Sequence, residues 1–180
     1  LCCLSSEYAE DMLESSATVK TAIHLIHQRD DLELQKIGGR CLNNLLLAQT
    51  KEDGAKFADF RAHVVTNVYP LTENGDEECA EMTIAILCKL SAFDDCKEPI
   101  VNSGMLRKID SGHMFGSKAL SMAYLTMLSN IASNLSMRSK ILNDRTIDKF
   151  TSMCLVEDAF IDLTVVKTVY ALSCAKDNLA

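Results

Sequence analysis

A short leucine-led word recurs along the chain at a nearly constant interval. The five leading leucines stand at positions 1, 42, 87, 128 and 172, so the steps between them are 41, 45, 41 and 44 residues. A Leu-x-x-apolar word can occur once by chance, but five copies at so even a spacing indicate a repeat. An interval of about 40–47 residues is typical of helical solenoids. The repeat therefore predicts an all-α chain built from successive helical units.

Each unit is predicted to end in a long amphipathic helix. Positions −8, −1, 0 and +3 relative to the leading leucine are mostly apolar, as in Leu120, Met127, Leu128 and Ile131. These positions fall on one face of a helix, which we expect to be buried. The long helices are predicted at residues 31–48, 76–93, 117–133 and 159–176.

Shorter helices are predicted before each long one. The second helix of each unit is expected at 18–29, 61–72, 105–113 and 145–156. Turn-forming residues predict breaks near 15–17, 73–75, 103–105 and 143–145, and another at Gly116.

These units organise the whole chain, 1–180, as a single domain. Residues 1–6 are expected to end one repeat, and four repeats follow at 7–49, 50–93, 94–133 and 134–180. Solenoid ends need polar capping repeats, and we find none at either end of this sequence. We therefore expect the chain to be an excerpt of a longer array.

Three helices per unit, with the first short and the third longest, argue against a two-helix repeat. The words that carry the pattern are NSGMLRKI at 102–109, where the first helix turns into the second, and CLNNLLLA at 41–48 and MLSNIA at 127–132, at the end of the third helix. In these words the chain resembles the armadillo-repeat family. The resemblance implies a right-handed α-α superhelical solenoid of three-helix repeats.

Charge and composition argue against several classes of protein. Eighteen Lys and Arg against 25 Asp and Glu give a net charge of −7, so nucleic acid is not an expected partner. The longest uncharged segment, 119–137, contains seven Ser, Thr or Asn residues, so no membrane span is expected. The eight cysteines include no C-x-x-C pair. We expect free thiols in a reducing compartment, the cytoplasm or the nucleus.

The sequence offers no catalytic or metal-binding constellation. His24 and His27 have metal-ligand spacing, but no companion ligand stands near them in a recurring pattern. His63 or His113 could pair with a cysteine, yet most cysteines fall on the buried face, where an inert thiol is expected. Gly38-Gly39 lacks a phosphate-loop pattern and predicts a close approach of helices. Acidic runs such as Asp76-Glu77-Glu78 are expected to be solvated helix caps. We expect no enzyme, cofactor, metal or small-molecule substrate.

A second stripe on the long helices is a candidate partner-binding surface. If positions −8, −1, 0 and +3 face the core, positions −6, −2 and +2 form a separate stripe, which is expected to line the concave groove of the solenoid. The alternative is a merely solvated face. The residues expected to bind a partner are Lys36, Arg40, Asn44, Lys89, Thr126, Asn130 and Tyr170.

The armadillo resemblance gives part of this stripe a role. In that family an Asn at position +2 often holds the backbone of an extended peptide, a role that would fall to Asn44 and Asn130. Nuclear-import adaptors of the family add a Trp four residues earlier, and this chain has no Trp. Lys36, Arg40 and Lys89 make one half of the stripe basic, which would suit a partner segment with acidic residues.

The sequence thus predicts a protein–protein interaction module that binds an extended segment of a partner protein or peptide. Two alternatives remain within the same fold. One is a chaperone-like or cytoskeletal solenoid that binds folded partners, and the other is a nuclear transport adaptor. A fragment of an enzyme is a further alternative, for which the sequence nominates no residues.

Overall fold

The computed structural model describes residues 11–12, 16–47, 56–73, 75–106, 118–141 and 159–173. Every regular element in these ranges is a helix, and none is a strand, which confirms the all-α prediction. None of the helices in these ranges has the length and apolar character that crossing a membrane requires. The uncharged segment 119–137 is divided between helix α8 (Lys118–Ala132) and the short 3-10 helix η3 (Leu135–Met137).

Four long helices lie where the repeat predicts them. They are α3 (Leu32–Leu47), α5 (Glu77–Leu90), α8 and α11 (Ala159–Ser173), and each end lies within three residues of the predicted end. Helix α5 shows how such a helix begins. The side chain of Asp76 accepts a hydrogen bond from the backbone N–H of Cys79 at 3.0 Å, which caps the first turn. Lys89 in the last turn interacts favourably with the other end of the helix dipole.

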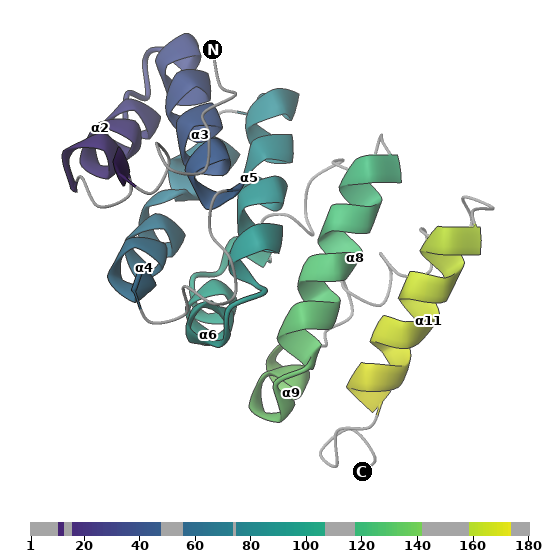
Figure 1. Cartoon of the computed structure of the whole chain (residues 1–180). Helices are drawn as coiled ribbons and strands as arrows, with labels where there is room; N and C mark the ends of the chain where they lie inside the picture. Colours follow the sequence, from purple (N-terminus) through teal and green to yellow (C-terminus); the bar gives the residue numbers. More distant parts are fainter. Residues whose placement is uncertain are drawn as a thin grey trace.

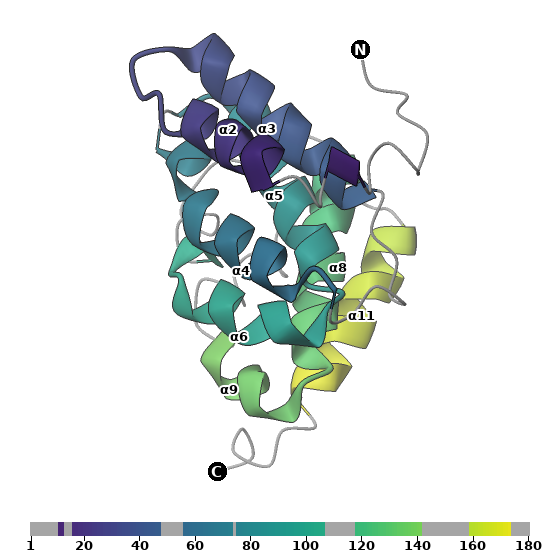
Figure 2. The same ribbon diagram turned by 60° about the vertical axis from the view of Figure 1, so that its left-hand side comes forward.

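The helices form two layers. The long helices lie side by side in chain order, α3 next to α5, α5 next to α8 and α8 next to α11 (Figure 1). The shorter helices form the second layer (Figure 2). Its members are α2 (Ser16–Ile26), α4 (Ala58–Asn67), α6 (Asp94–Asn102) and α9 (Arg138–Ile141), with the 3-10 helices η2 (Tyr69–Thr72) and η3.

The second helices of the first two predicted units are both present. Helix α2 corresponds to the prediction at 18–29, and α4 together with η2 corresponds to that at 61–72. The prediction at 105–113 is described only as far as residue 106, and that at 145–156 lies outside the described residues.

Two of the predicted breaks are confirmed by glycines in the left-handed region. Gly75 has a φ of 72° and precedes α5, while Gly104 has a φ of 76° and follows α6. Side chains other than glycine rarely adopt such a φ. The break predicted at 15–17 is wrong for residues 16 and 17, because α2 already begins at Ser16, and residue 15 lies outside the described residues. The break at 143–145 and the one at Gly116 lie outside the described residues.

Most of the predicted core face of the long helices is buried. Its described residues that are only partly buried are Leu34, Cys41, Thr164 and Ala171. The leading leucines Leu42, Leu87, Leu128 and Leu172 are only 0–1% exposed. Gly38 and Gly39 explain why α3 can pack closely on both sides. A Cβ added at Gly38 would lie 2.6 Å from the backbone oxygen of Ala22 in α2, and one at Gly39 would lie 3.2 Å from Met82 Sδ in α5. The sequence interpretation of this pair as a close approach of helices is therefore confirmed.

Candidate binding surface

The predicted partner-binding residues lie on the accessible side of the long-helix layer. Gly38 faces α2, and positions −6, −2 and +2 of α3 lie on the opposite side of that helix. We call the −6, −2 and +2 residues of the four long helices the long-helix surface. None of its described members is buried, so the stripe is accessible in the folded chain. These members are Lys36, Arg40, Asn44, Glu81, Ala85, Lys89, Met122, Thr126, Asn130, Val166 and Tyr170, while Cys174 lies outside the described residues.

Two of the predicted cations are paired with carboxylates of the next long helix. Lys36 Nζ lies 3.1 Å from Asp76 Oδ2 and 3.3 Å from Glu78 Oε2. Arg40 Nε donates to Glu78 Oε1 at 3.0 Å. The α3–α5 end of the long-helix surface is therefore locally neutralised, in contrast to the basic surface expected from the sequence. Asp76 and Glu78 also correct the expectation of merely solvated caps, because they join α5 to α3.

The pairing shifts the pKa values of the groups involved. Hydrogen bonding from Arg40, with a further contribution from Lys36, lowers the pKa of the Glu78 carboxyl. The pKa of Asp76 is lowered first by the backbone N–H of Cys79 and then by Lys36. The hydrogen bond to Asp76 raises the pKa of the Lys36 ammonium. Each shift favours the ionised form, so the cluster stays charged at neutral pH.

Lys89 also contacts the neighbouring helix. Its Nζ donates to both the backbone oxygen and the side-chain Oδ1 of Asn43, each at 2.8 Å. The side chain is half-buried, and burial lowers its pKa to about 8. Lys89 thus links α5 to α3 through hydrogen bonds and is not a freely accessible cation.

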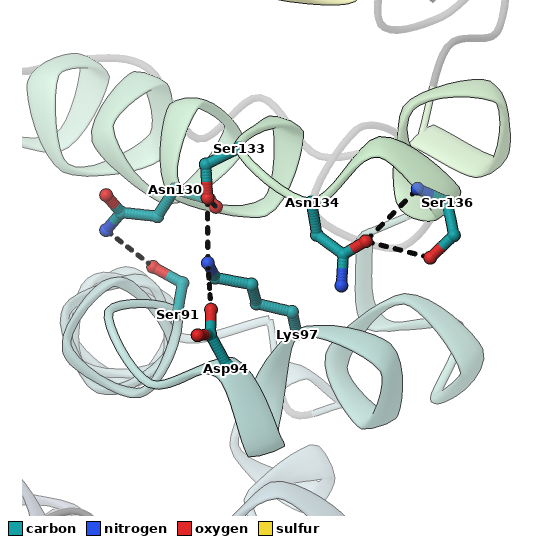
Figure 3. Close-up of polar contacts among 7 residues, drawn as sticks. All are labelled: Ser91, Asp94, Lys97, Asn130, Ser133, Asn134 and Ser136. Atoms are coloured by element: carbon teal, nitrogen blue, oxygen red, sulfur yellow. Dashed lines mark hydrogen bonds and ion pairs between the residues drawn. The ribbon is translucent and has the colours of Figure 1, made fainter.

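The two asparagines of the long-helix surface have different surroundings. The Asn130 Nδ2 donates to Ser91 Oγ at 3.0 Å, which joins α8 to the residue that follows α5 (Figure 3). Asn44 is half-buried and makes no hydrogen bond to another described side chain. Of the two amides, Asn44 is therefore the one that remains available to a peptide backbone.

The Asn130–Ser91 bond is one of several polar contacts around the end of α8, where it meets α6. Lys97 Nζ lies between Asp94 Oδ1, at 2.6 Å, and Ser133 Oγ, at 2.7 Å (Figure 3). Just beyond, Asn134 Oδ1 accepts hydrogen bonds from the backbone N–H and the hydroxyl of Ser136. These contacts satisfy polar groups where the two layers meet, which is a structural role.

The α8–α11 end of the long-helix surface is largely apolar. Val166 and Tyr170 are 63% and 70% exposed, and one turn before Val166 the neighbouring Leu163 is 52% exposed. On α8, Thr126 is exposed and Met122 is half-buried. The predicted residues Thr126 and Tyr170 thus lie at an end of the layer that leaves apolar side chains in contact with solvent.

The sequence reasoning missed a buried arginine in the second layer. Arg61 in α4 is 1% exposed, and its Nη2 donates to Asp95 Oδ2 in α6 at 2.7 Å. Its guanidinium also stacks on the ring of Phe93, 4.2 Å from the ring centroid. The spacing contained a signal, because Arg61 shares the apolar face of α4 with Val64 and lies in line with Val68, which follows the helix. Its role is to hold α4 and α6 together.

Two of the histidines that the sequence analysis considered, His24 and His63, lie within hydrogen-bonding distance of a side chain four residues later in the same helix or just after it. His24 Nε2 lies 3.1 Å from the Gln28 amide nitrogen, and His63 Nδ1 lies 3.3 Å from that of Asn67. Nowhere in the described part of the chain do three or more His, Cys, Asp or Glu side chains form a group that could hold a metal ion. His113 lies outside the described residues.

The cysteines that the structure describes are free thiols. They are Cys41, Cys79, Cys88 and Cys96. Burial raises the pKa of Cys88, and burial together with Asp95 raises that of Cys96 to about 12. A thiol with so high a pKa is a poor nucleophile at neutral pH. The other four cysteines lie outside the described residues.

Comparisons of the chain with family models, with curated proteins and with solved structures found no match.

Proposed function

We propose that the chain is a non-catalytic protein-interaction module with an armadillo-type, right-handed superhelical arrangement. Two observations support the architecture. The leucine-led word recurs every 41–45 residues, and each described copy from Leu42 to Leu172 lies in one of four long helices that are neighbours in chain order. A stack of similar units builds a continuous core and leaves a long surface for partners.

The function that this surface supports best is binding of an extended segment of another protein. The observation that carries the proposal is the exposure of Val166 and Tyr170, 63% and 70%, on the same stripe as Thr126 and Asn44. Exposed aromatic and aliphatic side chains that serve no core are typical of interaction sites. We further propose that the protein works in a reducing compartment, the cytoplasm or the nucleus, a proposal that the free thiols of the described cysteines support.

Different residues of the long-helix surface have different roles in this proposal. Asn44 has a free amide that can pair with a partner backbone of any sequence. Thr126 and Tyr170 supply contact area. Lys36, Arg40 and Lys89 shape the α3–α5 end and hold its helices together, and an acidic segment would have to displace Asp76 and Glu78 to reach the first two.

The test is selection and titration of peptide ligands. A phage-displayed library of random 12-residue peptides is selected on the immobilised chain, and the enriched peptides are titrated by fluorescence anisotropy. We expect saturable binding that Thr126→Arg weakens at least about tenfold, which corresponds to about 1.4 kcal/mol. Asn44→Ala should weaken it by about two- to tenfold, the value of one hydrogen bond.

Matched controls lie on the other layer of the molecule. Thr66 in α4 is exposed like Thr126, and Asn102 at the end of α6 is exposed. Thr66→Arg and Asn102→Ala should leave binding within about twofold of wild type. Loss of binding in Thr66→Arg but not in Thr126→Arg would place the site on the short-helix layer. Absence of any saturable peptide would refute the proposed function.

A further inference from the structure

Helix α11 carries a continuous exposed apolar face. Leu163, Val166 and Tyr170 have the spacing i, i+3, i+7, which puts them on one side of the helix. They are 52%, 63% and 70% exposed. The opposite side of α11 is occupied by Ile161, Val165, Thr168 and Leu172, all at most 3% exposed, and packs into the core. The exposed face therefore takes no part in the packing of the described helices.

Among the described residues of α11, one cation accompanies this face. Lys167 follows Val166, is exposed, and makes no ion pair with any described residue. It differs in this from Lys36 and Arg40, which are paired with carboxylates of α5. The local charge also differs from that of the whole chain. Although the net charge is −7, the described residues of α8 and α11 include Lys118 and Lys167 and only one acid, Asp162.

We infer that the α8–α11 end of the long-helix surface binds a partner segment in which a bulky apolar residue lies close to an aspartate or glutamate. The apolar residue covers Val166 and Tyr170, and the carboxylate pairs with Lys167. The inference rests on the proposed function and adds the chemistry of the segment. Charge complementarity favours an acidic segment at this end. Its carboxylate can pair with Lys167 here, whereas Lys36 and Arg40 at the α3–α5 end are already paired with carboxylates.

The helix geometry limits the spacing within the segment. Lys167 and Tyr170 are three positions apart on α11, and side chains at this spacing lie about 5–6 Å apart on the helix surface. An extended chain, which advances about 3.3 Å per residue, covers this distance in about two residues. The apolar and acidic residues of the partner should consequently stand within about three positions of each other.

The library selection described above tests this chemistry. We expect the enriched peptides to share a bulky apolar residue within about three positions of Asp or Glu. Tyr170→Ser should weaken binding of a selected peptide at least about tenfold, and Lys167→Glu should weaken it with a loss that shrinks as salt is raised. Changing the acidic residue of the peptide to Lys should restore binding to Lys167→Glu. A merely structural role of Lys167 would not produce this charge-swap rescue.

Two exposed residues elsewhere provide matched controls. Leu135 is 68% exposed, and Lys20 is an exposed lysine of α2. Leu135→Ser and Lys20→Glu should bind within about twofold of wild type. Thermal melting of each variant identifies any loss caused by unfolding, and Val166→Asp provides a second variant of the face if Tyr170→Ser is unstable.

The outcomes separate the inference from the function. If Thr126→Arg and Tyr170→Ser weaken binding but Lys167→Glu does not, the function stands and the inference is overturned. Enriched peptides without an acidic residue, or no charge-swap rescue, also overturn it. Sedimentation of the wild type as a dimer that Tyr170→Ser converts to a monomer would assign the face to a second copy of the chain and overturn it as well.

Discussion

The two ends of the long-helix layer use the same helix positions for different purposes. At α3 and α5, positions −6, −2 and +2 include Lys36, Arg40 and Lys89, and each of these side chains bonds to the neighbouring long helix. At α11, positions −6 and −2 are Val166 and Tyr170, which are mostly exposed. At one end this stripe holds neighbouring helices together, and at the other end its side chains stay exposed, where we propose that a partner binds.

Charge along one stripe of a helix does not by itself indicate a binding site. A cation that already contacts a carboxylate gains little from a second one, because the first pair must be broken and rehydrated. Exposed apolar side chains have no such alternative partner. The apolar end is therefore the stronger candidate for partner binding, although the basic residues were the more conspicuous feature of the sequence.

The largest expected effect tests whether the two ends share one core. Leu87→Ala in α5 and Leu128→Ala in α8 each remove a side chain that is at most 1% exposed, so each should cost about 2–5 kcal/mol of unfolding free energy. Urea titration followed by circular dichroism measures both. A cost below about 1 kcal/mol for one of them would mean that the ends differ in packing as well as in surface chemistry.

The next effect separates the two asparagines. Asn130→Ala breaks the bond to Ser91 and should cost about 0.5–1.5 kcal/mol of unfolding free energy. Asn44→Ala should change the unfolding free energy by less than about 0.5 kcal/mol and act on peptide binding instead. Equal destabilisation by the two variants in thermal unfolding would argue against this division.

Lys89 makes the α3–α5 end sensitive to pH. Its folded-state pKa of about 8 lies below the ordinary lysine value of 10.5, so between these values the unfolded chain binds more protons and folding gains stability as pH rises. Lys89→Met should remove about 1 kcal/mol of this gain between pH 7 and pH 10, a figure reduced because the side chain is half-exposed.

The measurement for Lys89 is the difference in unfolding free energy between variant and wild type at the two pH values. Lys20→Met, which changes an exposed lysine of α2, is the control and should show no such pH dependence. The same pH dependence in both variants would show that the surroundings of Lys89 do not lower its pKa.

The smallest effect concerns the ion pairs of the charged end. Glu78→Gln removes the partner of Arg40 and one partner of Lys36. Because these groups are accessible to solvent, we expect a slight decrease in melting temperature at low salt that disappears at about 0.5 M salt. The pKa of Glu78 is lowered in the folded state, so its contribution is present at neutral pH and is lost as pH falls through that folded value. A decrease that persists at high salt would indicate lost packing instead of lost charge pairing.

The repeat allowed most of the long-helix layer to be predicted. A leucine word at a period of 41–45 residues located four helices within three residues of their observed ends, because the buried face of a helix has a fixed period. Gly75 and Gly104 marked breaks for an equally local reason, since their positive φ values favour glycine. The predicted start of α2 differs by two residues from the observed one at Ser16, because no glycine marks that boundary.

Contacts between units could not be predicted in the same way. The pairing of Arg40 with Glu78 joins residues that are 38 positions apart, and that of Lys89 with Asn43 joins residues 46 positions apart. A pattern within one helix shows which side a residue occupies but not what the next helix places opposite it. The described residues of the stripe are accessible as predicted, while their charge balance differs from the prediction. That the stripe binds a partner stays a prediction.

Photo-crosslinking of a selected peptide tests the central claim most directly. The photoreactive residue p-benzoylphenylalanine is introduced in turn at positions 126, 170 and 66, and the peptide is identified by mass spectrometry after irradiation. We expect crosslinks from positions 126 and 170 on the long-helix surface and none from position 66 on α4. Crosslinks from position 66, with none from 126 or 170, would contradict the account.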